Sequence, residues 1–253
     1  MKLTALPFPV RKKIFKFKLI LHKYLLKSSK PLRSIYDIYL TPAYKDVTFK
    51  YYFKGTYGTF FSDLLKNFKT HAVFVDIGAN QGLFTILAAK NSNFKEVVSF
   101  EPSSRTSSLL RKNLKVNDVK NCRVVQAAIS DKNKELVLHS TDGHSGLSTL
   151  RSVESKEEKA FEKINAINHV KIDSLIPKHN CYIVKIDVEG HEEVVINELV
   201  KCSFFKHVEL IFCEIDEDWV EVESIKKTLS SFGFQHFKKI GKKTHYDLLI
   251  SKT

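Results

Sequence analysis

Short apolar runs alternate with segments of helical spacing along most of the chain. The apolar runs predict strands in VFVDIGANQG (73–82), VVSFEP (97–102), CRVVQAAISD, ELVLHS, CYIVKIDVEG (181–190) and VELIFCEI (208–215). Helices are expected between them, in LFTILAAK, SSLLRKNLKVND, HEEVVINELVKC and DWVEVESIKKTLSSFG. FQHFKKIGKKTHYDLLIS predicts two final strands joined by a turn at Gly241 to Lys243. This alternation predicts an α/β fold with a doubly wound, mostly parallel sheet and an antiparallel C-terminal strand.

The turn after the first strand has the features of a nucleotide-like cofactor site. Asp76 follows the apolar run, and Gly78 and Gly82 permit sharp backbone turns where a Cβ would collide with a ligand or a helix. A dinucleotide fingerprint would need a further glycine where Ala79 and Asn80 stand. The turn therefore favours a cofactor without a pyrophosphate, although a plain strand-to-helix loop is the simpler alternative.

The second strand also ends in an acid, about twenty residues further along the chain. In parallel strand-helix-strand units an acid at this strand tip accepts hydrogen bonds from ribose hydroxyls, and Glu101 holds that place. Pro102 and the serines after it suit the start of a helix equally well. The two interpretations are compatible.

KIDVEGHE, at residues 185–192, concentrates acid and base groups at the end of another strand. Sheets of this type bind ligands at the carboxyl ends of their strands, where Asp187, Glu189 and His191 are expected. Any of the three is a candidate base for a reaction that removes a proton from a hydroxyl. Glu189 is also explained as an acid favoured near a helix N-terminus, and His191 as a solvated residue at a helix start. Asp187 is the strongest catalytic candidate.

Glu214 ends the next strand and is the remaining catalytic candidate, as a polar support for the substrate or for the Asp187 loop. Together with Asp187 it offers oxygen ligands to a magnesium-like ion. The local spacing supplies no full ligand set, so a divalent metal is not favoured and no metal ligand is assigned.

These segments resemble the FkbM-type methyltransferases over about residues 55–250. The resemblance rests on VFVDIGANQGLFTILAA, VVSFEPS, VVQAAISD, SGLSTL and the paired VKIDSL and VKIDVEGHE segments. It implies a Rossmann-like class I methyltransferase sheet and S-adenosylmethionine as the cofactor. The residues that it assigns to cofactor binding are Asp76, Gly78, Ala79, Asn80 and Gly82 on the methionine side, Glu101 at the ribose, and Ala128, Ser130 and Asp131 near the adenine.

Further features narrow the chemistry. Relatives often carry a Tyr-Glu pair just before the first strand, where this chain has Gly58, Thr59 and Phe60. The Pro-Pro-Tyr motif of amino-methylating nucleic-acid enzymes is missing after Asp187. The four cysteines form no C-x-x-C pair, which favours buried structural thiols, no zinc and a reducing cytoplasm; they are Cys122, Cys181, Cys202 and Cys213.

The first 54 residues differ in charge from the rest, and we expect a basic helical extension (1–54) before a methyltransferase domain (55–253). Residues 1–50 hold twelve Lys or Arg against two Asp, so ten of the net +13 charges lie there. RKKIFKFKLILHKYLLK, at 11–27, predicts a basic amphipathic helix that is too charged for a signal peptide or a membrane span. It either docks on an anionic membrane surface or packs on the domain. Nucleic acid is less favoured because no RNA-binding module accompanies the charge.

Residues 141–168 are polar and interrupt the strand pattern. They predict a substrate lid or an insertion, with residues 145–150 ordered over the site and an exposed helix at Glu154–Glu162. Asp173, just beyond, is expected to serve as a turn or cap residue rather than as a catalyst.

The combined expectation is an O-methyltransferase that acts on a hydroxyl of a sugar in a cell-surface or lipid-linked glycan. It would work in the cytoplasm, with docking at the inner membrane face as an additional possibility. A secondary metabolite or RNA is the alternative substrate, and a non-catalytic cofactor-binding module is the alternative outside enzymes.

Overall fold

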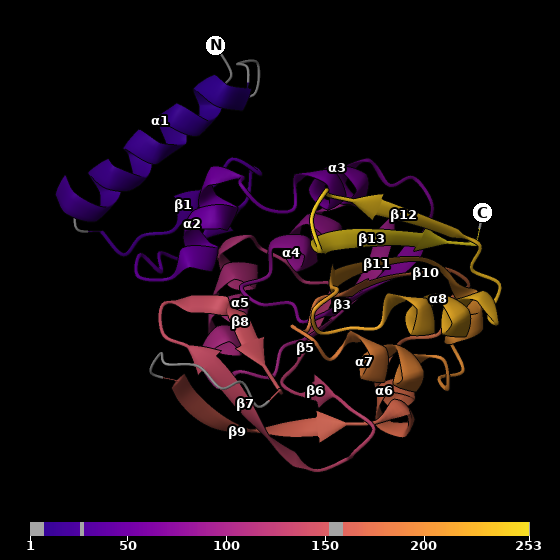
Figure 1. Cartoon of the computed structure of the whole chain (residues 1–253). Helices are drawn as coiled ribbons and strands as arrows, with labels where there is room; N and C mark the ends of the chain where they lie inside the picture. The colour runs from indigo at the N-terminus through magenta and orange to yellow at the C-terminus, as the bar shows by residue number, and fades with distance from the viewer. Residues whose placement is uncertain (1–7, 26–27, 152–158, 253) are drawn as a thin grey trace.

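A sheet of seven strands forms the centre of the molecule (Figure 1). The computed structural model describes residues 8–25, 28–151 and 159–252 of the chain. Only the last strand of the chain runs antiparallel to its neighbours, which confirms the predicted sheet. In spatial order the strands are β12 (His236–Ile240), β13 (His245–Ser251), β11 (Val208–Asp216), β10 (Tyr182–Ile186), β3 (Ala72–Ile77), β4 (Phe94–Phe100) and β5 (Cys122–Val125).

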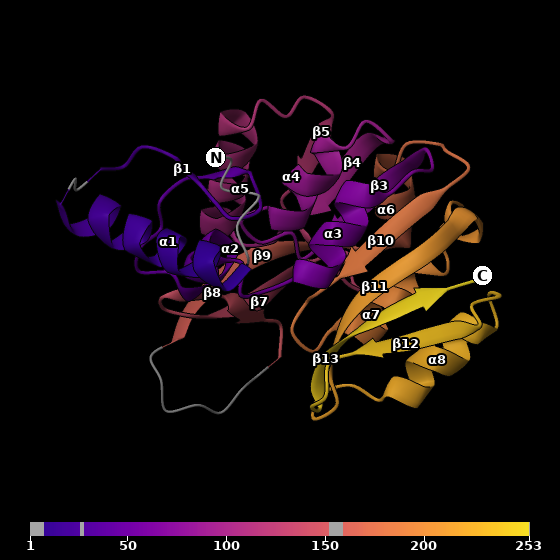
Figure 2. The same ribbon diagram turned by 90° about the horizontal axis from the view of Figure 1, so that it is seen from above.

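Helices cover both faces of this sheet (Figure 2). Alternate side chains of a strand point to opposite faces, so Val73 and Val75 join one apolar cluster and Phe74 joins another. The first cluster includes residues of α6 (His169–Leu175), α7 (Glu192–Leu199) and α8 (Val222–Ser230). The second includes residues of α2 (Val47–Lys54), α3 (Thr59–Asn67), α4 (Leu83–Lys90) and α5 (Ser104–Val116). Because both faces are buried, the inner strands β3 and β10 are apolar except for the buried Asp76 and Lys185, in agreement with the sequence pattern.

The chain order reverses beside β3. From β3 the chain builds β4 and β5 on one side and then returns to place β10 on the other side. The carboxyl ends of β3 and β10 are therefore adjacent, and the backbone N–H of Asp187 donates to the carbonyl of Ile77 at 3.1 Å. Such a reversal opens a crevice at the strand ends, which is where open α/β sheets bind ligands.

A second, smaller sheet carries the polar region that interrupts the pattern. Its order is β6 (Ala128–Ile129), β9 (Lys159–Ile167), β7 (Glu135–Thr141) and β8 (His144–Thr149). The single strand expected in CRVVQAAISD is wrong, because its first half forms β5 in the central sheet and its second half forms β6 here.

The helix expected at Glu154–Glu162 is also wrong where it can be checked. Residues 159–162 begin β9, and residues 154–158 lie outside the described residues. Leu136 pairs with Ile164 across the β7 and β9 strands, and Leu138 and Ile164 are buried together. Cross-strand pairing over an apolar face thus outweighs the helix propensity of a Lys- and Glu-rich segment.

The N-terminal part of the chain is closely joined to the rest. β1 (Leu32–Arg33) pairs with β2 (Tyr39–Leu40), and Leu40, Phe49 and Phe53 are fully buried in the second apolar cluster. Of the helix predicted at 11–27, residues 11–25 are helical, in α1 (Phe8–Ile20) and a π-helical turn at Leu21–Leu25, and residues 26–27 lie outside the described residues. Among the described residues, no helix combines the length and apolar character that crossing a membrane would require.

Candidate active site

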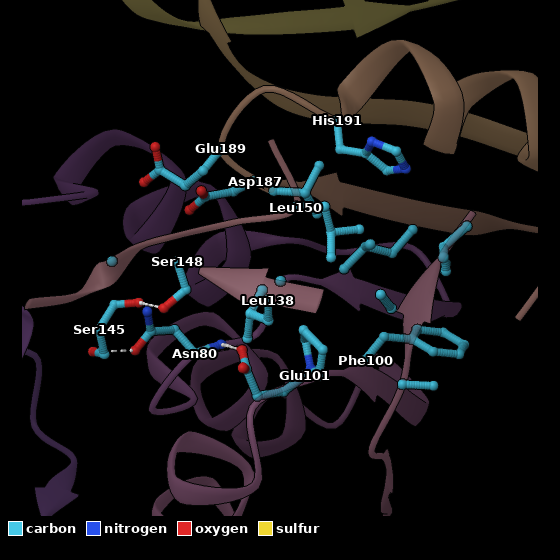
Figure 3. Close-up of a pocket in the computed structure, with 18 residues that line it drawn as sticks. Asn80, Phe100, Glu101, Leu138, Ser145, Ser148, Leu150, Asp187, Glu189 and His191 are labelled. Carbon is cyan, nitrogen blue, oxygen red and sulfur yellow. Dashed lines mark hydrogen bonds between the residues drawn. The ribbon is translucent and has the colours of Figure 1, made fainter. Parts of the chain in front are cut away.

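A cavity lies at the carboxyl ends of β3, β4 and β10, beneath β8 of the second sheet (Figure 3). One part of its wall is apolar and comes from Phe100, the β5–β6 connection and the second sheet; the residues are Phe100, Ala127, Ala128, Ile129, Leu138 and Leu150. Polar groups line the remainder, namely Asn80, Glu101, Ser145, Ser148, Asp187, Glu189 and His191. The cavity therefore has an apolar slot bordered by one acid at β4 and a group of acids beyond β10.

Glu101 stands at the apolar slot and is fixed by backbone donors. Its carboxylate accepts from the N–H of Asn80 at 2.8 Å and from the N–H of Ser103 at 3.1 Å. Burial raises the pKa of Glu101 to about 7, although the two backbone donors oppose this rise. Ser103 is the N-cap of α5, so the strand tip and the helix start coincide, as the sequence suggested.

The loop after β3 has a shape that depends on three residues with positive φ, Gly78, Asn80 and Gly82. A Cβ on Gly78 would lie 1.8 Å from the carbonyl oxygen of Asp187, so only glycine allows β3 and β10 to approach this closely. Asn80 has φ of 49°, an uncommon conformation for a residue with a side chain. Its Oδ1 accepts from the backbone N–H of Gln81 and from the Ser145 hydroxyl, which hold the side chain over the cavity.

The other residues expected on the methionine side are buried behind this loop. Asp76 is fully buried and accepts from the Thr85 hydroxyl at 2.5 Å. Ala79 donates its N–H to the carbonyl of Phe100. Gly82 is the N-cap of α4, where a Cβ would meet Leu110 at 2.3 Å. These three shape the loop from behind, whereas Gly78 and Asn80 line the cavity itself.

Asp187 is the most heavily supported acid of the site. The Lys185 ammonium lies 3.1 Å from its Oδ2, and the Tyr57 hydroxyl donates to the same oxygen at 2.9 Å. Burial alone would raise the pKa of Asp187, but Lys185 and hydrogen bonds from Glu214 and Tyr57 hold this pKa below its usual range. Asp187 is therefore ionised at neutral pH.

The neighbouring acids are shifted in the opposite direction. Asp187, Glu189 and Glu214 each place a carboxylate oxygen within 4.8 Å of the others. Burial, followed by repulsion from Asp187, raises the pKa of both Glu189 and Glu214 well above the usual range. Asp247, paired with Glu214 across β11 and β13, has a pKa raised to about 7 for the same two reasons. One ionised carboxylate thus stands among protonated carboxyl groups.

Glu189 is also conformationally strained. Its φ is 53°, and Gly190 follows with φ of 93°. A Cβ on Gly190 would lie 2.7 Å from Arg151 and 3.1 Å from Trp219. Two consecutive left-handed residues turn the chain sharply after β10 and direct the Glu189 side chain toward Asp187 (Figure 3).

His191 lines the cavity but points away from the acids (Figure 3). Burial lowers the pKa of its imidazole, opposed by the nearby Asp131 carboxylate. Asp131 itself is exposed, and the buried Ser130 donates its hydroxyl to Asp131. Of the residues expected near an adenine, Ala128 is at the cavity, whereas Ser130 and Asp131 are not among its described lining residues.

β8 bridges the two ends of the cavity, so residues 145–150 are ordered over the site, as predicted. Ser145 bonds to Asn80 at one end, and at the other the Thr149 hydroxyl donates to the carbonyl of Glu189 at 2.6 Å. Ser148 lines the cavity between them.

Lys185 and Tyr57 are site residues that sequence reasoning missed. Lys185 is buried inside β10, where it donates to the carbonyl of Gly78 at 2.7 Å and lies 3.7 Å from Asp76. It is the one charged residue in the apolar run YIVKI, and that exception was the available signal. Tyr57 precedes the positions Gly58, Thr59 and Phe60 that depart from the family pattern, but no local pattern links it to Asp187, 130 residues away.

The lining residues fit S-adenosylmethionine. The apolar slot has the character that an adenine ring requires, and Glu101 retains acceptor capacity beyond its two backbone donors for ribose hydroxyls. At the other end the ionised Asp187 complements the positive charge of a sulfonium. The catalytic candidates Asp187, Glu189 and Glu214 converge at this end, while His191 lies apart from them.

Several solved structures share parts of the fold. A ribosomal protein L11 methylase from Lactobacillus delbrueckii subsp. bulgaricus is 14% identical with a TM-score of 0.43, over 76% of this chain and 75% of that one. M. capricolum TrmK in complex with S-adenosyl-homocysteine is 12% identical with a TM-score of 0.46, over 76% and 67%. A precorrin-6y C5,15-methyltransferase from Geobacter metallireducens GS-15 is 11% identical with a TM-score of 0.44, over 76% and 85%. These values are too low to support a functional inference.

The family is shown by sequence rather than by these structures. Among proteins of curated function, none matches the chain. The family described as Methyltransferase FkbM domain matches residues 76–236, which is more than half of the chain and includes the β3 loop, Glu101 and the acids beyond β10. The chain therefore belongs to the FkbM methyltransferase family and is an S-adenosylmethionine-dependent methyltransferase.

Proposed function

We propose that the protein methylates a hydroxyl of a sugar in a cell-surface or lipid-linked glycan. The observation that carries this proposal is the charge arrangement beyond β10, where the ionised Asp187 lies beside the protonated Glu189 and Glu214. An ionised carboxylate accepts the proton of an acceptor hydroxyl, and the neutral carboxyl groups donate or accept hydrogen bonds to neighbouring hydroxyls.

S-adenosylmethionine, when bound, supplies an electrophilic methyl group on a sulfonium. With the cofactor bound, Asp187 would accept the O–H proton while the acceptor oxygen gains the methyl group and the sulfonium leaves as a neutral thioether. Proton loss late in this step is favourable even to a carboxylate of lowered pKa, because the hydroxyl becomes strongly acidic once its oxygen bonds to carbon. Lys185 and Tyr57 keep Asp187 ionised and oriented, and residues of β8 cover the cavity beside it.

The polar groups around the acceptor position support a sugar. Glu189, Glu214 and Ser148 present hydrogen-bonding groups from three separate strand ends or lid positions. A sugar ring has adjacent hydroxyls that bond to several such groups at once, and this fixes which oxygen faces the methyl group. An apolar metabolite would make no hydrogen bonds to these half-buried polar groups, whereas the hydroxyls of a sugar match them.

A divalent cation at Asp187, Glu189 and Glu214 is the second candidate mechanism for the same reaction. The oxygens of the three carboxyl groups are close enough to share an ion. Lys185 already neutralises Asp187, however, and proton binding by Glu189 and Glu214 relieves the remaining repulsion without a metal. We therefore favour the carboxylate base, and expect methyl transfer to persist after treatment with a chelator.

The acceptor class is tested by labelled methyl transfer. The protein is incubated with methyl-labelled S-adenosylmethionine and cell extract, and the products are separated into glycolipid, nucleic acid and small molecules, with and without chelator. Label in glycolipid supports the proposal, whereas label in RNA or small molecules favours the alternative substrates. If no fraction is labelled although calorimetry shows cofactor binding, the proposed acceptor class is rejected for that extract.

A further inference from the structure

α1 is attached to the body of the protein by one of its faces. Phe15 is buried, 7% exposed, with its ring 5.5 Å from that of Phe53 in α2. On the same face, Arg11 donates to the carbonyl of Ile35 and Lys18 to the carbonyl of Arg33. Residues 11, 15 and 18 follow the spacing of a single helix face. This contact fixes which side of α1 is turned outward.

The outward side of α1 carries a stripe of apolar side chains. Val10, Ile14, Phe17 and Ile20 are 43%, 37%, 67% and 46% exposed. Their spacing of four, three and three residues places them along one face, opposite the buried Phe15. Figure 1 shows α1 at the periphery of the molecule, away from both sheets. Apolar side chains gathered on one outward helix face indicate an interaction surface.

Cations border this stripe. Lys12, Lys13 and Lys16 are exposed on α1. Helical spacing places Lys12 and Lys16 between Ile20 and the packed Phe15, and Lys13 between Ile20 and Phe17. Lys50 and Lys54 of α2 lie close to these cations. Burial, and then repulsion from Lys16, Lys50 and Lys12, lowers the pKa of Lys54, which shows that the positive charges are near one another. No Asp or Glu occurs in the first 36 residues of the chain. The charge beside the stripe is therefore of one sign.

We propose that α1 docks the protein on an anionic membrane surface. The helix lies along the surface, with the side chains of Val10, Ile14, Phe17 and Ile20 inserted at the level of the headgroups and Lys12, Lys13 and Lys16 on lipid phosphates. This combination of an apolar face and an adjoining basic face is the signature of a helix that lies in the membrane interface. Because Arg11, Phe15 and Lys18 hold the opposite face, docking requires no unfolding of the contact between α1 and α2.

Charge selects this partner over two others. A second copy of the chain would bring two helices of the same strong positive charge together, which opposes pairing through the stripe. A nucleic acid would satisfy the lysines, but it would leave Phe17 and Ile20 in water, since nucleic-acid surfaces present phosphates to such a helix. An anionic lipid surface accommodates both the lysines and the apolar side chains.

Co-sedimentation with vesicles tests the proposal without cofactor or acceptor, so the result is independent of methyl transfer. The full chain is mixed with vesicles of phosphatidylcholine alone or of phosphatidylcholine with phosphatidylglycerol. We expect binding to the anionic vesicles, much weaker binding to the neutral ones, and loss of binding at high salt. Absence of binding to the anionic vesicles, or equal binding to both, overturns the proposal.

Two variants and a matched control identify the surface. Phe17→Ser should lower partitioning onto anionic vesicles about ten-fold, and Lys12→Gln/Lys13→Gln/Lys16→Gln about a hundred-fold. Phe161→Ser removes a phenyl ring of the same 67% exposure from β9 and should leave binding unchanged. Circular dichroism of each variant confirms that the fold is retained. Equal binding by all variants, RNA binding in place of vesicle binding, or a dimer lost in Phe17→Ser would each overturn the membrane assignment.

Discussion

The two ends of the cavity hold their principal acids in opposite ways. The Glu101 carboxylate accepts from the backbone N–H groups of Asn80, in the loop after β3, and Ser103, in the loop after β4. Burial raises the pKa of Glu101 to about 7. Asp187 is fixed by the side chains of Lys185, Tyr57 and Glu214, and its pKa is lowered despite burial. The same chemical group is thus partly protonated near pH 7 at Glu101 and ionised at Asp187, according to what surrounds it.

This difference separates recognition from chemistry. Backbone donors cannot be altered by most substitutions, so the Glu101 end is a fixed receptor for the cofactor. Side chains keep Asp187 ionised, so single substitutions can change the charge state of Asp187 without disturbing the loop that binds the cofactor. Four substitutions examine this separation, beginning with the largest expected effect.

Asp187→Asn should abolish methyl transfer. The amide cannot accept the acceptor proton, so kcat should fall by roughly a thousand-fold or more. Cofactor affinity should remain within a few-fold, because Glu101 and the apolar slot are untouched. Labelled methyl transfer gives the rate and calorimetry gives the affinity. Asp63→Asn, the same change at an exposed site on α3, is the control. Full activity in Asp187→Asn would remove this residue from the mechanism.

Lys185→Met should chiefly affect stability. Removal of the ammonium leaves Asp187 and Asp76 buried without their shared cation, which costs about 3–5 kcal/mol for a broken buried ion pair. Urea denaturation measures the loss as a lower midpoint at an unchanged slope. Lys185→Met/Asp76→Asn removes one of the stranded charges and should recover part of the stability. A change below about 1 kcal/mol in the single variant would contradict the assigned role.

Most of the fold is predictable from the sequence because the patterns that indicate its strands and turns are local. The strands flanking the switch point are apolar runs, and the turn glycines and terminal acids follow them directly. Gly78 is one example of such a local pattern, because the carbonyl of Asp187 approaches so closely that there is no room for a Cβ and only glycine fits. The segment at 159–162 shows the limit, because its pairing with β7 depends on a partner about twenty residues away and not on its own propensity.

The charge states of the acids beyond β10 are harder to predict from the sequence. Asp187, Glu189 and Glu214 were predicted as candidates from their places at strand ends, and the structure brings them together. Their division into one charged and two neutral groups depends on Lys185 and on Tyr57, and Tyr57 comes from a loop before the first strand of the sheet. His191 was grouped with them by sequence adjacency alone, but the turn at Glu189 and Gly190 directs it elsewhere.

Glu101→Gln should weaken cofactor binding about ten-fold and remove its pH dependence. Glu101 accepts ribose hydroxyls best when ionised, and its pKa is raised to about 7. Affinity of the unmodified protein should therefore increase as the pH rises from about 6 to about 8. Gln carries no charge at any pH, so its affinity should be low and constant over this range. Calorimetry with S-adenosylhomocysteine measures both profiles, and parallel pH dependence in the two proteins would exclude Glu101 as its source.

Tyr57→Phe should produce the smallest effect, a displacement of the acid limb of the pH–rate profile. The Tyr57 hydroxyl stabilises the ionised form of Asp187, so its removal raises the pKa of that carboxyl. Activity requires the ionised form and is lost as pH falls through this pKa. The acid limb of kcat/KM should therefore move to higher pH by about half a unit to one unit. Tyr52→Phe, altering a ring 5.8 Å from Tyr57, is the control and should leave the limb in place. An acid limb that stays in place or moves to lower pH in Tyr57→Phe would mean that this limb does not report the ionisation of Asp187, and the proposed base would have to be sought among its neighbours.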